Sequence, residues 1–284
     1  MRKIMHVGFV AVALGAGLVG IVAGPAAPAS ASVPGITVET AQSPNDSYDK
    51  TVTVRCPSGK KVIDAGGYIE NGGGKVTLDD IFPDPDLNFV NATGLETDSY
   101  GSNWRVHAYA TCADSMPGLE WIKAQTATNS DSPKTLTVAC SPGKTVLGAG
   151  DTITGGDGEV FVDEAVPNGG AGVAATQVSL IGVEGDDYSG KWDLDGFLIC
   201  ADPRPGQQVV SAVTSSAAGD KGTLVSCGTQ IATGGTTELV GASGQVVIAS
   251  DYSSSTTTAT VRGEVNDGST LGWSAKVYAF CADS

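Results

Sequence analysis

The sequence predicts an all-β protein built from three similar, disulfide-linked antiparallel units. Three observations lead to this prediction: apolar and polar residues alternate with period two, one sequence unit occurs three times, and each copy contains one pair of cysteines. Gly, Ser, Thr and Asn interrupt the chain at short intervals and helical periodicity is nearly absent, as all-β proteins require. We expect five or six short strands in each copy.

The first segment, residues 1–31, has the features of a secretory signal peptide. A basic start is followed by an apolar run and by Ala29-Ser30-Ala31, which is typical of a cleavage site. The alternative is an uncleaved membrane anchor. No later apolar run is long enough to span a bilayer. The sequence therefore predicts a secreted, extracellular protein with no membrane span in the mature chain.

Three copies of one unit follow, over residues 32–115, 116–203 and 204–284. Each copy closes with a strand that runs from a tryptophan to a cysteine: Trp104–Cys112, Trp192–Cys200 and Trp273–Cys281. Each copy also has an earlier strand that runs from a lysine to a cysteine: Lys50–Cys56, Lys134–Cys140 and Lys221–Cys227. The third copy has no convincing equivalent of the matched segments 76–83 and 160–167.

Repetition selects one cysteine pairing out of the fifteen that six cysteines allow. The predicted disulfides are Cys56–Cys112, Cys140–Cys200 and Cys227–Cys281, one in each copy. Free thiols or a metal site are the alternative. However, the chain has no Cys-x-x-Cys pair, and His107 is the single histidine after residue 31, so a typical zinc ligand set is missing.

Strand parity separates a core face from a surface face. The face that joins the tryptophan to the cysteine stays apolar in all three closing strands, so it predicts the core. The opposite face changes from His107 to Asp195 to Lys276 between copies, so it predicts a solvated surface.

Short connectors between the copies predict close packing, and two architectures fit. One is a single body with three sheets around a pseudo-threefold axis, like a β-prism. We favour it because amphipathic sheets need a partner for their apolar face. The alternative is three small β-sandwiches in tandem.

Two motifs carry a resemblance to known proteins. Residues 56–66 and 140–150 have the pattern Cys-x-x-Gly-Lys-x-Val-x-x-x-Gly, and all three copies end in aromatic-x-x-Cys-Ala. The arrangement resembles secreted three-copy β-repeat proteins of high-GC Gram-positive bacteria, which have no settled activity. The resemblance implies a β fold and an extracellular location, and it supplies no catalytic residue. The three-sheet arrangement also resembles vitelline-membrane-type and jacalin-type β-prisms, by analogy of architecture alone.

Composition and motifs argue against several functions. A formal charge of −15 disfavours nucleic acids as partners, because phosphate contacts require basic residues. The lone His107 has no nucleophile signature near it, and Gly143-Lys144-Thr145 lacks the earlier glycine and the helix of a phosphate loop. The sequence therefore predicts a protein that is not an enzyme.

Two sets of residues are candidates for binding. The matched acidic pairs Asp79-Asp80 and Asp163-Glu164 are either solvated acids at strand ends or ligands for calcium, which takes several oxygen ligands. No cofactor other than calcium is expected. The candidate ligand-binding aromatics are Trp121, Tyr100 and Tyr188. Trp121 corresponds to Val38 and Val209 in the other copies, so it is either a core residue or a local binding residue.

These observations leave three functional hypotheses. The first is a secreted, lectin-like protein that binds an extracellular ligand, most plausibly a neutral glycan, because repeated loops suit multivalent recognition. The second is a structural or assembly component that binds a co-secreted protein. The third is an acid-based glycoside hydrolase, which requires two carboxylates across a cleft.

Overall fold

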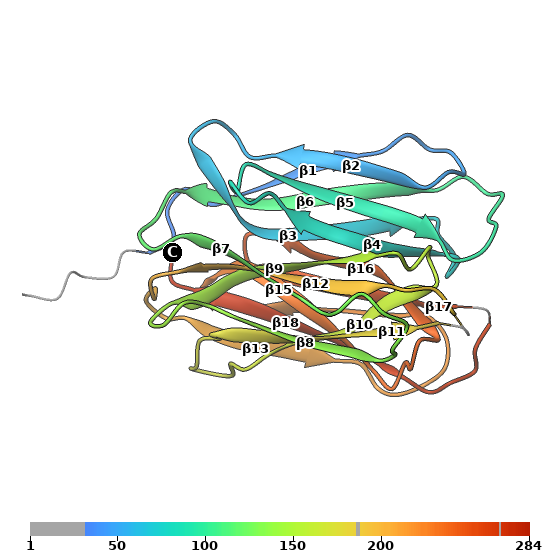
Figure 1. Cartoon of the computed structure of the whole chain (residues 1–284). Coiled ribbons are helices and arrows are strands. Elements are labelled where there is room, and N and C mark those ends of the chain that lie inside the picture. Colours follow the sequence, from blue (N-terminus) through green and yellow to red (C-terminus); the bar gives the residue numbers. More distant parts are fainter. Residues whose placement is uncertain (1–31, 186–187, 267) are drawn as a thin grey trace, which may run out of the picture.

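The computed structural model describes residues 32–185, 188–266 and 268–284. These residues form eighteen β-strands and no helix, which confirms the all-β prediction (Figure 1). The predicted signal peptide, residues 1–31, lies outside the described residues. No helix in the described part of the chain is long and apolar enough to cross a membrane.

Six strands lie within each predicted repeat. The first contains β1 (Thr37–Gln42), β2 (Lys50–Arg55), β3 (Lys60–Glu70), β4 (Val76–Pro83), β5 (Phe89–Glu96) and β6 (Arg105–Asp114). The second contains β7 (Glu120–Gln125), β8 (Lys134–Ala139), β9 (Thr145–Thr154), β10 (Val160–Pro167), β11 (Gln177–Glu184) and β12 (Asp193–Ala201). The third contains β13 (Gln208–Val213), β14 (Lys221–Ser226), β15 (Ile231–Val240), β16 (Val246–Ser255), β17 (Thr258–Val265) and β18 (Ser274–Ala282).

The strands form three six-stranded antiparallel sheets, and every sheet is shared by two repeats. Sheet I has the order β1-β6-β3-β16-β17-β14, sheet II β2-β5-β4-β9-β12-β7, and sheet III β13-β18-β15-β10-β11-β8. In each sheet the first, sixth and third strands of one repeat continue into the fourth, fifth and second strands of another. The three exchanges close a cycle. The repeats are therefore joined to one another through shared sheets.

The repeats meet at three seams in the middle of the sheets, β3–β16, β4–β9 and β10–β15. The registered pairs at the seams are Tyr68–Ser250, Gly67–Asp251, Thr152–Asp80, Asp151–Ile81 and Glu238–Glu164. Neighbouring strands of one repeat pair over at least six residues. The registered pairing between repeats is thus shorter than the pairing within them.

The apolar core follows the predicted face. Trp104, Trp192 and Trp273 are fully buried and belong to one core cluster that reaches all three repeats. Within each repeat, half of one sheet packs on half of another, so that Trp104, directly before β6, lies against Gly94 of β5. This face-to-face burial of apolar side chains is the main favourable term in the fold.

One disulfide ties the two facing half-sheets of each repeat together. The bonds are Cys56–Cys112, Cys140–Cys200 and Cys227–Cys281, as predicted. Each cysteine pair joins a strand of one sheet to the end of a strand of another sheet. No cysteine in the described residues is free. Three disulfides agree with an oxidising, extracellular location.

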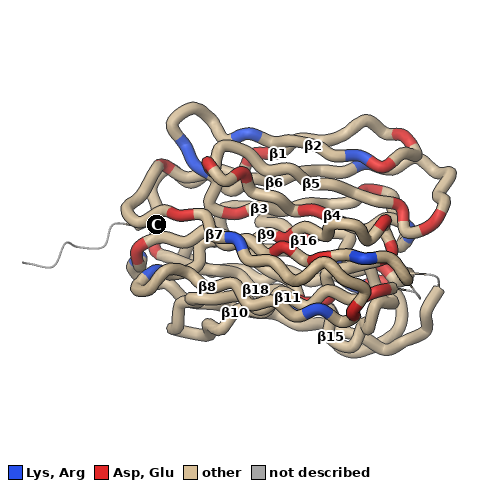
Figure 2. Tube along the Cα trace, in the orientation of Figure 1, with Lys and Arg blue, Asp and Glu red and all other residues tan. Residues whose placement is uncertain are grey.

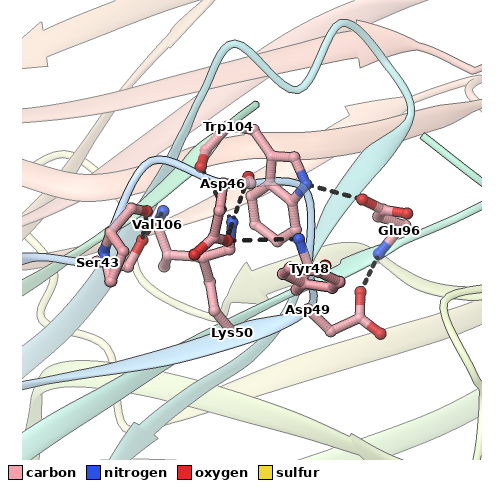
Figure 3. A network of polar contacts seen from close by, with 9 residues as sticks. Ser43, Asp46, Tyr48, Asp49, Lys50, Glu96, Trp104 and Val106 are labelled. Atoms are coloured by element: carbon pink, nitrogen blue, oxygen red, sulfur yellow. Dashed lines mark hydrogen bonds and ion pairs between the residues drawn. The ribbon is translucent and has the colours of Figure 1, made fainter. Parts of the chain in front are cut away.

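A lysine covers the buried tryptophan in every repeat. The Nζ atom of Lys50 lies 3.7 Å from the centre of the Trp104 ring and donates to the carbonyl oxygens of Asp46 and Trp104 (Figure 3). The indole N–H of Trp104 donates to Glu96 at 3.0 Å. Lys134 and Lys221 lie over Trp192 and Trp273 in the same way. The repeated lysine thus caps the core through a cation–π contact and backbone hydrogen bonds.

A β-bulge interrupts the third strand of each repeat, where β3, β9 and β15 approach one another at the centre of the body. The equivalent residues after the bulge are Asp64, Gly148 and Gly234. A Cβ atom on Gly148 would lie 2.3 Å from the carbonyl oxygen of Ile63, and one on Gly234 would lie 2.5 Å from the carboxyl carbon of Asp64. Only one of the three positions can carry a side chain.

Two expectations about the surface and the third repeat were wrong. The outer face of β12 is buried, because Gln125 and Thr128 bond Asp193, and Lys123 pairs with Asp195 at 2.6 Å. The third repeat does have an equivalent of segments 76–83 and 160–167. It is β16, whose sequence differs so much that only its place in the sheet reveals it.

Replacement of Gly148 by alanine should lower the free energy of unfolding by about 3 kcal/mol, because the new methyl group would press on backbone atoms that cannot move apart cheaply. Urea denaturation of the oxidised protein measures this. Gly101→Ala is the matched control, since nothing lies within 4 Å of its Cβ position and its stability should change little. Equal stability of the two variants would contradict the close approach.

Replacement of Cys227 and Cys281 together by serine should cost about 4 kcal/mol, because the bond closes a loop with a sequence separation of 54 and restricts the unfolded chain. The midpoints of thermal unfolding of the double variant and the wild type, measured side by side, test this prediction. A midpoint within 2 °C of the wild type would show that the disulfide adds little.

Candidate functional site

The outer face of sheet I carries two rows of residues that run across all six strands. Side chains alternate between faces, so these residues point away from the buried Trp104–Ala108 face. The first row is Leu224, Thr260, Tyr252, Gly66, Tyr109 and Thr40. The second row is Gly222, Arg262, Ser250, Tyr68, His107 and Gln42. We call these two rows the tyrosine platform.

The tyrosine rings of the platform pack together across the β3–β16 seam. Tyr252 and Tyr109 stack with ring centres 4.1 Å apart, and Tyr68 lies 6.4 Å from Tyr252. The two stacked residues stand on either side of Gly66. A Cβ atom on Gly66 would lie 2.6 Å from the Cβ of Tyr252, so the glycine is what lets the rings meet.

A groove of about 490 Å³ lies beside these rings, in the size range of small-ligand sites. Its walls include Tyr68 and Tyr252 on one side and Leu224 of the edge strand β14 on the other. Leu224 is 58 % exposed. The groove also offers the hydroxyl groups of Ser250, Thr223 and Thr260, so an apolar surface and hydrogen-bonding groups lie together.

The charges around the groove are arranged in pairs. Arg262 lies 2.9 Å from the buried carboxylate of Glu264 and 4.0 Å from Asp220. His107 lies 3.0 Å from Glu70. Burial, followed by the neighbouring Tyr252, raises the pKa of Tyr109 to about 12, so its hydroxyl stays protonated at neutral pH.

The equivalent positions on the other two sheets differ in charge. The position of Ser250 is taken by Asp80 in sheet II and by Glu164 in sheet III, and the position of His107 by Asp195 and Lys276. Sheet I is the face whose two rows contain no carboxylate. The repeats thus differ most on the face that holds the tyrosines.

Trp121 lies on the outer face of sheet II, partly buried on the edge strand β7. Its ring stacks on Phe197 at 5.4 Å, and its indole N–H donates to the carbonyl oxygen of Pro83 at 3.0 Å. One side of the residue lines a hollow of about 440 Å³ that also contains Leu119 and Pro85. Trp121 therefore contributes to packing and to a surface hollow together.

Tyr100 and Tyr188 occupy equivalent places in the first and second repeats. The hydroxyl of Tyr100 donates to the carbonyl oxygen of Asn71, and that of Tyr188 lies 3.4 Å from the carbonyl oxygen of Gly155. Each tyrosine thus contacts a hairpin of its own repeat. In the part of the chain that the structure describes, no ring contact joins them to Trp121 or to the tyrosine platform, so their role in binding stays a prediction.

The acidic pairs proposed for calcium lie at bulges in β4 and β10. Asp79 and Asp163 are buried, and one carboxyl oxygen of each accepts no hydrogen bond. Burial, followed by Asp80, raises the pKa of Asp79 to about 8, and burial with Glu164 raises that of Asp163 to about 7. Among the described residues no group of three or more His, Cys, Asp or Glu is arranged to hold a metal ion.

Sequence reasoning missed most of the platform. Tyr252 and Arg262 lie in the third repeat, where the repeat pattern is weakest. No motif in the sequence places Tyr68 and Tyr109 beside them. The missing signal was the pairing of β3 with β16, which joins strands from the two ends of the chain.

Comparison with known proteins adds no function. The chain matches no protein-family model, and no curated protein shows significant similarity to it. Any function must therefore be argued from the geometry of the chain itself.

The raised pKa values of Asp79 and Asp163 predict a protein that is less stable at higher pH. Between about pH 4 and pH 7 an unfolded aspartate releases its proton while the folded one keeps it, so unfolding becomes easier as the pH rises. Each such group contributes at most about 1.4 kcal/mol per pH unit. Urea denaturation at pH 5 and pH 8 should show the decrease.

Asp79→Asn should weaken this pH dependence, because the amide cannot ionise. The exposed Asp86→Asn is the control and should leave the dependence unchanged. A wild-type protein of equal stability at both pH values would refute the assignment.

Proposed function

We propose that this protein is a secreted, non-enzymatic β-repeat protein that binds an extracellular neutral glycan on its tyrosine platform. The observation that carries the proposal is the groove between Leu224 and the rings of Tyr68 and Tyr252. Aromatic rings offer a flat apolar surface with a polar edge. Such a surface suits the C–H face of a sugar ring, and the neighbouring Ser and Thr hydroxyls suit its hydroxyl groups.

Charge supports a neutral ligand. The whole chain has a formal charge of −15, so its field repels anionic polysaccharides. The one cation in the groove, Arg262, is already paired with Glu264 and Asp220. Its remaining N–H groups can donate to sugar hydroxyls, while its charge is largely balanced.

The composition of the platform also supports binding without cleavage. Glycoside hydrolysis by carboxylates needs an acid and a base or nucleophile on either side of the scissile bond. The two rows of the platform contain neither Asp nor Glu. A sugar held there would meet hydroxyls, rings and a guanidinium group.

Binding to a co-secreted protein is the second candidate function. The exposed Leu224 on the edge strand β14 favours it, because an apolar residue on an unpaired strand edge can receive another chain. Under this alternative, Leu224→Asp would abolish capture of a secreted protein, and no polysaccharide would bind.

The test is retention of the oxidised protein on a panel of immobilised polysaccharides, with soluble competitor. Tyr252→Ala should weaken binding at least about tenfold, the size of a binding hot spot. Tyr48→Ala is the matched control, since Tyr48 is 74 % exposed and lies outside the platform. Loss of binding with Trp121→Ala but not with Tyr252→Ala would move the site to sheet II. No saturable binding across the panel would refute the proposal.

A further inference from the structure

Two aspartates occupy the inner side of the seams between repeats. Asp251 of β16 pairs with Gly67 of β3, and Asp151 of β9 pairs with Ile81 of β4. Both line one small cavity of about 10 Å³ at the centre of the body, together with Thr236 of β15. Figure 2 shows acidic positions in the middle of the body, close to the labels of β9 and β16.

The surroundings of these carboxyl groups contain no compensating charge. The residues that line the cavity include no Lys, Arg or His. The six central strands are β3, β4, β9, β10, β15 and β16. Besides Tyr68 and Tyr252 on the outer face, their titratable residues are Asp64, Glu70, Asp79, Asp80, Asp151, Asp163, Glu164, Glu238 and Asp251, with Lys60 and Lys61. The two lysines begin β3 and bond to Asp114 and to Asn88. The hydroxyl group of Thr236 is buried beside the cavity without a hydrogen-bond partner, and it carries no charge that could balance the carboxylates.

Asp64 extends the acidic centre. Its carboxylate accepts hydrogen bonds from the Ser253 hydroxyl at 3.1 Å and from the Ala149 amide at 3.3 Å, so it touches the other two repeats. After burial, the negative charge of Asp251 is the next cause that raises the pKa of Asp64. Each repeat therefore contributes one aspartate to the centre.

The strand pairing at the seams is short. Each seam has one or two registered pairs, and all three disulfides lie within repeats. The shared core and hydrogen bonds such as that from the Gly74 amide to Glu264 also join the repeats. A change of charge at Asp151 and Asp251 acts directly beside the paired residues of two seams.

The tyrosine groove lies across one of these seams. Tyr68 comes from β3 and Tyr252 from β16, and Ser250 beside Tyr252 is the seam partner of Tyr68. An opening of the β3–β16 seam, whose inner side carries Asp251, would separate Tyr68 from the other lining residues, which lie on β14, β16 and β17.

We propose that Asp64, Asp151 and Asp251 form a proton-operated lock that closes the seams in acid, opens them in alkali, and thereby controls ligand binding in the tyrosine groove. The binding part of this proposal rests on the proposed function, whereas the opening of the seams does not.

Electrostatics gives the direction of the switch. Burial raises the pKa of Asp251 to about 7. Burial and then the charge of Asp251 raise the pKa of Asp151 and of Asp64 well above its ordinary value. The folded, closed form therefore binds protons more tightly than an open form in which water reaches the carboxylates. Rising pH favours the open form.

Hydrogen exchange of the oxidised protein at pH 5 and pH 9 tests the lock without any ligand. After correction for intrinsic exchange, protection of seam amides such as that of Asp251 should fall at least about tenfold at pH 9. Amides of the β3–β6 pairing inside the first repeat should stay protected. Equal loss of protection at both places, or none, would overturn the proposal.

The variant Asp151→Asn/Asp251→Asn mimics the protonated pair and should keep the seams closed at both pH values. Asp86→Asn, an exposed change of the same kind, should behave as the wild type. Asp251→Asn alone serves if the double variant does not fold, and it should reduce the pH effect. Seam protection that depends on pH as strongly in these variants as in the wild type would refute the assignment to these residues.

A binding experiment tests the link to the groove, with the polysaccharide that the wild type retains at pH 5 as the ligand. Its dissociation constant should rise at least about tenfold at pH 9, because the binding-competent fraction falls, and by less than about twofold in the double variant. If the dissociation constant does not change while the protection of the seam amides falls, the seams do not control binding in the groove. Binding at neither pH, with an intact effect on seam protection, would refute the proposed function and leave the lock in place.

Discussion

The close approach of three bulged strands at the centre sets the conditions for the rest of the structure. β3, β9 and β15 come so near one another that Gly148 and Gly234 leave room for the single side chain of Asp64. This approach brings the inner strands into register for pairing across repeats. The sheets, the seams and the shared core all follow from the geometry at that point.

Symmetry holds in the interior and breaks on the surface. The buried tryptophan, its covering lysine and the disulfide recur in every repeat, because each repeat must bury the same apolar face. The outer faces have no such constraint. Sheet I carries tyrosines and no carboxylate in its rows, sheet II has Trp121 packed over Phe197, and sheet III has Glu164 and Glu238. One scaffold thus presents three different surfaces.

The features that recur in all three repeats could be predicted from the sequence. The alternation of Trp104, Val106 and Ala108 predicts the core face, and the threefold recurrence of two cysteines selects the disulfides that form. It could not predict which strand pairs with which across repeats, because the pairing at Tyr68–Ser250 leaves no local pattern. For this reason Tyr68 and Tyr252 could not be placed on one platform. The burial of Asp193 and Asp195 was missed because their cover comes from another strand, β7.

The shared sheets also determine how the chain can reach its native state. β3 is synthesised within the first quarter of the chain, yet its seam partner β16 follows only after well over half the chain. Until β16 arrives, one edge of β3 has no partner, and an unpaired edge is a site for association with other chains. Pairing over such sequence separations is slow, because the loop must close before the contact gains anything. The sheet that contains β3 is therefore complete only after the third repeat has been synthesised.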